Sequence, residues 1–233
     1  MQIVPGFPGY YFAKNINIVN YIIIVHYICS VKFLCMTPNK ELQESRMRGY
    51  FIEATREILK GEGLKALNVR AVAERAGYSY ATLYNYFKDL NELVFICVND
   101  FMLECESFVE DQTRQHQPGR QRLKRRMIAY IQYFTQYPGI FELFFIERMN
   151  SIGSQHPTAA AIYRFTDRLT EADLAAMVGE SMADKETAEN IRLSLRNAAA
   201  GMLLFYMNRM QPDGYRTFME TAERQLDFIL GKD

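Results

Sequence analysis

Residues 69–88 read VRAVAERAGYSYATLYNYFK, and this stretch decides the fold. It predicts two short helices joined by the turn Gly77-Tyr78-Ser79, which is the spacing of a helix-turn-helix motif. Gly77 has no Cβ and tolerates the positive φ that such a turn needs. Asn68 and Ser79 precede the two helices and are good caps, because their side-chain oxygens accept free backbone N–H groups.

The side chains of this motif divide into a buried and an exposed set. We expect Val72, Ala73, Ala76, Tyr78 and Leu83 to pack between the helices, and Phe87 to join the core. The others are expected to face outward toward DNA; these candidate DNA-binding residues are Arg70, Ser79, Tyr80, Ala81, Thr82, Tyr84, Asn85, Tyr86 and Lys88. The tyrosine hydroxyls and Thr82 suit phosphate oxygens, which accept most protein–DNA hydrogen bonds. Four basic residues and one acidic residue lie between Leu64 and Lys88, although the whole chain has no net charge.

This pattern resembles the tetracycline-repressor (TetR) family of bacterial regulators. The likeness rests on residues 69–79 and 81–88, continues at Glu92-Leu93, and covers residues 47–95 in all. It implies an α-helical homodimer whose small amino-terminal domain binds double-stranded operator DNA and whose larger body senses a ligand. It favours a repressor that a small effector releases from a palindromic operator. Tyr80 is bulkier than the small or basic residue usual in the family, so the operator sequence does not follow from the resemblance.

Helical periodicity continues along the chain from Glu41. Apolar residues recur every three or four positions, and no stretch alternates with the period of a strand for long. Helices are expected over residues 41–61, 68–76, 79–86, 90–116, 122–136, 140–149, 158–182, 186–210 and 214–230. The sequence therefore predicts an all-α fold of about nine helices. Residues 41–95 are expected to form the helix-turn-helix domain, and residues 96–233 a ligand-binding and dimerisation bundle.

Residues 1–40 differ in composition from the rest of the chain. The first 35 positions contain two lysines and no Arg, Asp or Glu, and their centre is apolar. We interpret this extension as a mis-assigned start, with translation beginning at Met36, and expect the residues before it to be dispensable. One alternative is a membrane anchor over residues 16–35 of a membrane-anchored sensor-regulator, although its asparagines oppose insertion. Another is an additional packed strand or helix.

Aromatic and methionine side chains are concentrated in the carboxy-terminal body. We expect an apolar effector pocket between its helices, because methionines adapt to irregular ligands and tyrosine hydroxyls supply polar contacts. The candidate ligand-binding residues are Tyr130, Phe134, Phe141, Phe145, Met149, Tyr163, Met202 and Phe205. The last two long helices are expected to form the homodimer, because the small-residue run AAAG at 198–201 lets two helices approach closely.

The sequence contains no motif typical of an enzyme or a metal site. Its four cysteines form no CxxC pair, its three histidines are scattered, and neither a catalytic triad nor a phosphate-binding loop is present. We therefore predict a cytoplasmic regulator without cofactor, metal or catalytic residues. The basic run at residues 120–126 is expected to be a solvated helix start.

Overall fold

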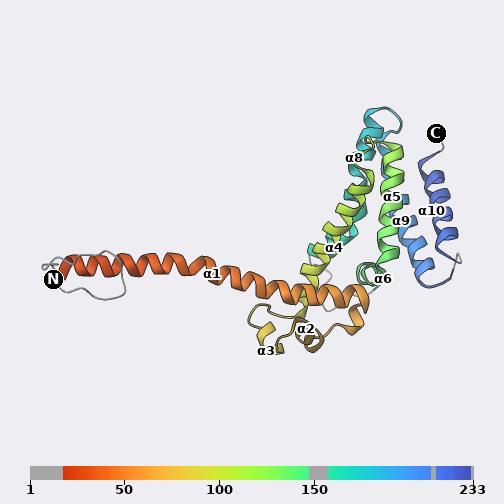
Figure 1. Ribbon diagram of the computed structural model, residues 1–233. Helices are drawn as coiled ribbons and strands as arrows, with labels where there is room; N and C mark the ends of the chain where they lie inside the picture. Colours follow the sequence, from red (N-terminus) through yellow and green to blue (C-terminus); the bar gives the residue numbers. More distant parts are fainter. Residues whose placement is uncertain (1–17, 147–156, 211–213, 232–233) are drawn as a thin grey trace. The chain divides into compact units, whose positions relative to one another are not determined.

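The computed structural model describes residues 18–146, 157–210 and 214–231, without the side chains of residues 18–38 and 157–159. The chain divides into two units, Met1–Arg48 and Gly49–Asp233. The elements are α1 (Ile18–Gly61), the 3₁₀ turn η1 (Leu64–Ala66), α2 (Val69–Ala76), α3 (Tyr80–Leu83), α4 (Leu90–Thr113), α5 (Arg120–Gln136), α6 (Pro138–Phe141), the π-helical turn η2 (Glu142–Ile146), α7 (Pro157–Tyr163), α8 (Phe165–Gly179), α9 (Lys185–Met207) and α10 (Tyr215–Leu230) (Figure 1). These ranges contain no strand, which confirms the predicted all-α class.

The first unit, as far as it is described, is the amino-terminal part of α1. The three interpretations of residues 1–40 are a mis-assigned start, a membrane anchor, and an additional packed strand or helix. They concern side chains that lie almost entirely outside the described part of the chain. Among the residues that are described, no helix has both the length and the apolar character needed to cross a bilayer.

The second unit begins with a small helical domain built around Phe51 of α1. Phe51 is fully buried, and its ring centroid lies 5.7 Å from that of Tyr78 and 6.2 Å from that of Phe87. Val72 of α2 and Leu83 of α3 are also fully buried. Burial of one such side chain contributes roughly 1.5–3 kcal/mol, so these contacts hold α2 and α3 against α1. The expected burial of Leu83 is confirmed, whereas Tyr78 keeps 38% of its surface exposed.

The two motif helices begin and end as their caps predict. The Asn68 side chain accepts the Ala71 N–H at 3.0 Å, and the Ser79 hydroxyl accepts the Thr82 N–H at 3.2 Å. Gly77 ends α2 in the left-handed conformation, with φ 77°. Its own N–H and that of the next residue bond back to α2 carbonyls, which closes the helix end.

Three helices have bounds different from those predicted. The helix expected over 79–86 ends at Leu83, because the next N–H groups bond to carbonyls three or four residues back and the chain follows tight turns. The one expected over 140–149 is divided between α6 and the π-helical turn η2, and its last residues are outside the described part. The one expected over 158–182 is interrupted at Arg164, whose N–H still bonds to the carbonyl four residues back at 3.1 Å. The interruption is therefore a local irregularity.

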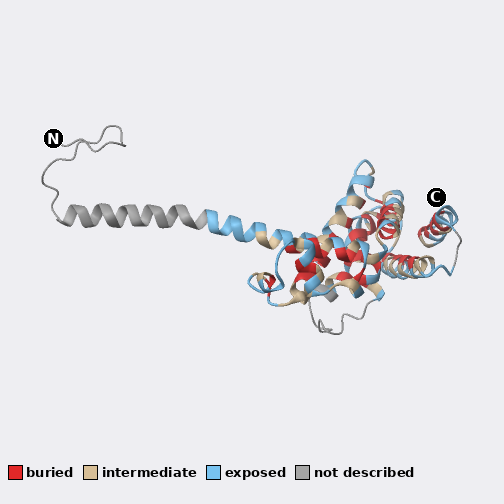
Figure 2. Ribbon diagram, turned by 60° about the horizontal axis from the view of Figure 1, so that its bottom comes forward, coloured by how far each residue is buried: buried red, intermediate tan, exposed pale blue. Residues whose placement is uncertain are grey.

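Helix α5 is the centre of the carboxy-terminal body. It packs against α4, α8, α9 and α10. Its buried residues occur on several sides of the helix and include Leu123, Met127, Tyr130 and Phe134. A helix with buried residues on several sides is covered by neighbours on those sides. Figure 2 shows the buried residues gathered inside this part of the molecule.

The basic run at residues 120–126 is not the solvated helix start that we expected. Arg122 Nε donates to Asp173 Oδ1 at 2.7 Å, and this α8 carboxylate is fully buried. Arg126 Nη1 donates to Glu110 Oε2 of α4 at 2.8 Å. Buried charges need ionic partners, and these two arginines supply them. The start of α5 therefore connects α4 to α8 through ion pairs.

Candidate nucleic-acid interface and effector site

The outward face of the helix-turn-helix motif is formed by α3 and the turn after it. Tyr80 and Tyr84 are one helical turn apart and are 60% and 52% exposed, while Leu83 and Phe87 point into the core. All candidate DNA-binding residues are exposed or half-buried: Arg70, Ser79, Tyr80, Ala81, Thr82, Tyr84, Asn85, Tyr86 and Lys88. The motif thus presents a continuous accessible surface of polar, aromatic and small side chains.

Two hydroxyl groups on this surface are occupied by the cap of α3. The Ser79 and Thr82 hydroxyl oxygens lie 2.9 Å apart and share a hydrogen bond, and the Ser79 oxygen also accepts the Thr82 N–H. Beside them, Tyr80, Ala81 and Asn85 are exposed. These three side chains are therefore the ones most available for contact with another molecule.

Charge on this domain lies at the edges of the outward face. No charged residue occurs between Arg75 and Lys88. Arg75 forms an ion pair with Glu62, with Nη2 and Oε1 2.6 Å apart, so its charge is largely compensated. Arg70 on α2 and Lys88 before α4 are exposed. An uncharged central strip between two cations suits a surface that contacts bases centrally and phosphates at its edges.

Lys88 is positioned by a reciprocal cap at the start of α4. Its backbone N–H donates to Glu92 Oε2 at 2.8 Å, and the Glu92 N–H donates to Asp89 Oδ1 at 3.0 Å. These two bonds form a capping box in which the glutamate bonds to the residue before the cap. This arrangement fixes the backbone of Lys88 and leaves its side chain exposed.

The small domain is joined to the body by an ionic network around Glu104 of α4. Its carboxylate accepts from Arg56 Nη2 at 2.7 Å and from Lys60 Nζ at 2.7 and 2.9 Å, both on α1. Burial opposes ionisation of Glu104, but the hydrogen bonds and charges of Lys60 and Arg56 together lower its pKa. This network cannot be predicted from the sequence, because Lys60 and Arg56 are 44 and 48 residues from Glu104 and no local pattern connects them.

Helix α6 approaches the end of α1 very closely at Gly139. A Cβ atom at this position would lie 2.4 Å from the Leu59 carbonyl oxygen and 3.1 Å from that of Lys60. The Lys60 ammonium also lies 4.7 Å from the centroid of the Tyr137 ring, just before α6. Only glycine fits this contact, so α6 and α1 are in direct backbone contact between the small domain and the body.

Four of the predicted ligand-binding residues form the centre of an aromatic cluster in the body. The Phe134 ring lies 4.9 Å from Tyr130, 5.9 Å from Phe141 and 5.7 Å from Phe145, measured between centroids. The Tyr130 hydroxyl accepts a hydrogen bond from Thr166 at 3.3 Å, and burial raises the Tyr130 pKa. The cluster is thus apolar, with one neutral polar group inside it.

The remaining predicted ligand-binding residues do not join this cluster as a group. Tyr163 and Phe205 are 63% and 54% exposed, and Met202 is half-buried at the edge of the core. Met149 lies outside the described residues. Tyr163 instead accepts a hydrogen bond from Arg196 of α9 at 3.0 Å. The structure therefore separates a buried group around Phe134 from exposed aromatics on other helix faces.

A groove of about 970 Å³ lies between α8 and α9. Its apolar lining includes Leu174, Val178 and Ala188, and its charged lining includes Glu171 and Lys185. None of the seven predicted ligand-binding residues that the structure describes lines it. The aromatic cluster and this groove are therefore different places.

The two described cysteines are not suited to redox chemistry. Burial, followed by the charge of Asp100, raises the pKa of Cys97 to about 12. Burial likewise raises the pKa of Cys105. Thiolates are the reactive form, so both thiols are inert packing groups at neutral pH.

Comparison with known proteins gives the same class as the motif. Residues 51–95 match the family model for bacterial regulatory proteins of the tetR family. The HTH-type transcriptional activator FasR of Mycolicibacterium smegmatis is 23% identical over 171 residues, which is 73% of this chain and 77% of FasR.

Solved structures of regulators share the fold. A TetR family transcription regulator from Marinobacter aquaeolei is 18% identical, with a TM-score of 0.58 over 81% of this chain and 97% of its own. The transcriptional regulator FadR of Bacillus subtilis, solved in complex with stearoyl-CoA, is 12% identical, with a TM-score of 0.62 over 80% of this chain and 99% of its own.

A helix-turn-helix domain joined to a larger helical body defines a class of one-chain transcriptional regulators. Within that class, residues 51–95 match the tetR family of bacterial regulatory proteins, and most of the chain shares the fold of solved tetR-family regulators. The chain is therefore similar to this family.

Proposed function

We propose that this chain is a cytoplasmic, homodimeric repressor that binds a palindromic operator through α2 and α3 and is released by a small effector. The observation that carries the DNA-binding part is the exposed, uncharged face of α3 between the cations Arg70 and Lys88. Phosphate contacts from Arg70, Thr82, Tyr84, Tyr86 and Lys88 position the motif, and Ser79, Tyr80, Ala81 and Asn85 face the bases. No catalytic role is assigned.

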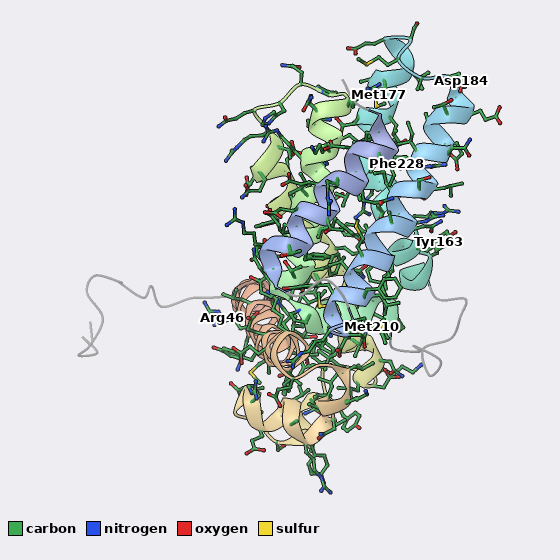
Figure 3. All side chains as sticks on the ribbon, turned by 90° about the vertical axis from the view of Figure 1, so that its right-hand side faces the viewer. Arg46, Tyr163, Met177, Asp184, Met210 and Phe228 are labelled. Atoms are coloured by element: carbon green, nitrogen blue, oxygen red, sulfur yellow. The ribbon has the colours of Figure 1, made fainter. Side chains whose placement is uncertain are left out.

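The proposed dimer forms through α9 and α10. Phe228 of α10 is 83% exposed, and Leu204 and Phe205 of α9 are 38% and 54% exposed, on the helices that face the viewer in Figure 3. Gly201 has nothing within 4 Å of the place where its Cβ would be, which leaves room for a second helix. Exposed large apolar side chains on adjacent helices mark protein interfaces. A symmetric pair of motifs suits a palindromic operator, whose half-sites lie a helical turn or a multiple of it apart.

The proposed effector binds in the aromatic cluster around Phe134, at Tyr130, Phe141 and Phe145, with Met202 at the edge of the core. Met149 lies outside the described residues and stays a predicted contact. Tyr163 and Phe205 are exposed and are no longer assigned to it. An apolar molecule with one polar group matches this environment. FadR, which has the same fold, was solved with stearoyl-CoA, an acyl thioester with a long apolar chain. This supports a lipophilic effector for the present chain.

The proposed signal passes from the cluster to the DNA-binding domain through α4 and α6. Phe141 belongs to both the cluster and α6, and α6 contacts α1 at Gly139. On α4, the centroid of the Phe101 ring lies 4.9 Å from the guanidinium carbon of Arg56, which also bonds to Glu104. A ligand that displaces cluster side chains shifts these contacts and with them the spacing of the two recognition helices.

We propose repression rather than activation, and this choice has its own test. FasR is named an activator, so a promoter-reporter assay with and without the regulator gene decides between repression and activation. Sedimentation of the purified chain with and without operator duplex tests the dimer. We expect one dimer per palindrome at micromolar concentration, and Phe228→Arg to give monomers with weakened operator binding. A Glu223→Arg variant, exposed on α10 but on a different face from Phe228, is the matched control.

A further inference from the structure

The central strip of the recognition surface, residues 76–87, contains none of the side chains that read guanine or cytosine by charge. Residues 76–87 contain no Arg, Lys, Asp or Glu. Arginine or lysine is the commonest reader of guanine in the major groove, and aspartate or glutamate accepts from cytosine. Arg75 directly precedes this stretch, and its Nη2 forms an ion pair with Glu62 Oε1 at 2.6 Å. Residues 76–87 therefore offer no charged readout of a G·C pair.

The side chains that remain favour the other base pair. Asparagine makes a bidentate contact with the N6 and N7 groups of adenine, and small or aromatic apolar groups contact the thymine methyl group. Asn85, in the turns that follow α3, is the amide on this surface, and Ala81 of α3 is exposed as well. Tyr80 presents an exposed ring beside Ala81. The Ser79 and Thr82 hydroxyls, which suit any base, are hydrogen-bonded to each other.

We propose that each operator half-site is read through A·T pairs, with thymine methyl groups against Tyr80 and Ala81 and an adenine edge against Asn85. This inference rests on the proposed function, because it names the bases that the same surface reads. Tyr84, Arg70 and Lys88 contact the backbone and add no sequence preference. Specificity then comes from apolar contacts and one amide, and affinity comes from the flanking cations.

The experiment uses the full chain and changes only the DNA. Duplexes bound by the protein are enriched from a random library, and we expect A·T pairs at the centre of each enriched half-site. Each thymine is then replaced in turn by uracil, which removes one methyl group. A contacted thymine should lose affinity about fourfold, the value of one buried methyl-sized group, and a thymine outside the half-site should lose none. Replacing the contacted adenine by 7-deazaadenine, which lacks N7, should weaken binding roughly tenfold.

Protein variants connect each base to its residue. In Asn85→Ala, replacing the contacted adenine by 7-deazaadenine should no longer weaken binding. In Ala81→Gly, one of the thymine-to-uracil replacements should no longer weaken binding. Melting temperatures are recorded for both variants. Lys88→Ala is the matched control, because it should weaken every duplex equally and keep the same base preference.

The outcomes separate this inference from the proposed function. Enriched half-sites with G·C pairs at their centre, or affinities that uracil leaves unchanged at every thymine, overturn A·T readout while DNA binding stands. Binding to no duplex in the library overturns the proposed function itself and the inference with it.

Discussion

Replacing Lys88 with alanine is expected to halve the salt dependence of operator binding. Two exposed cations per subunit, Arg70 and Lys88, flank the recognition face, and a dimer therefore places about four cations at phosphates. The slope of log K against log salt is then about −0.9 × 4, or about −3.6, for the unchanged protein, and about −1.8 for Lys88→Ala. Between 50 and 200 mM salt, affinity should fall about 150-fold for the first and about 12-fold for the second.

The matched control for this prediction is Arg75→Ala. Arg75 belongs to the same domain, but Glu62 already compensates its charge at 2.6 Å, so its removal should leave the slope unchanged. Fluorescence anisotropy of a labelled operator duplex, titrated at four or more salt concentrations, measures all three slopes. The reasoning is refuted when Lys88→Ala keeps the original slope, or when Arg75→Ala lowers it as much as Lys88→Ala does. Either result would mean that a different face of the motif lies on the phosphates.

Three further predictions concern stability and coupling. Leu83→Ala should reduce the free energy of unfolding by about 2–5 kcal/mol, because the side chain is fully buried; a loss of operator affinity at unchanged thermal stability would contradict its place in the core. Gly139→Ala forces a Cβ to within 2.4 Å of the Leu59 carbonyl oxygen and should reduce the free energy of unfolding, measured by chemical denaturation, by about 1–3 kcal/mol. Gly179→Ala, whose Cβ meets nothing within 4 Å, should leave the free energy of unfolding unchanged. Glu104→Gln should destabilise the protein by about 1–2 kcal/mol at pH 7, because Arg56 and Lys60 lose a charged acceptor. The folded state lowers the pKa of Glu104, so its contribution is present above the ordinary glutamate pKa and is lost as the pH falls through the lowered value. Urea denaturation of the wild type and the Gln variant should therefore converge in acid, and a difference that persists there would contradict the ionic origin of the effect.

The helix-turn-helix motif was predictable from sequence because its signals act over three or four residues. Asn68, Ser79 and Asp89 each bond to an N–H three positions ahead, and Gly77 takes the left-handed conformation that its turn requires. The burial of Leu83 follows from the same local periodicity. Fold class and the outward set of side chains depend on such short-range rules, so they could be deduced without the structure.

The body of the protein shows the limit of that reasoning. Arg122 looked like a solvated helix residue, but its partner Asp173 is 51 residues away on α8. Tyr163 and Phe205 have the composition of pocket residues, yet they are exposed because the faces of α7 and α9 that carry them turn away from α5. Sequence alone determined the helices, their caps and the motif that meets DNA. Only the tertiary structure decided which charges pair, which aromatics meet and where α6 touches α1, because these depend on which faces of distant helices pack together.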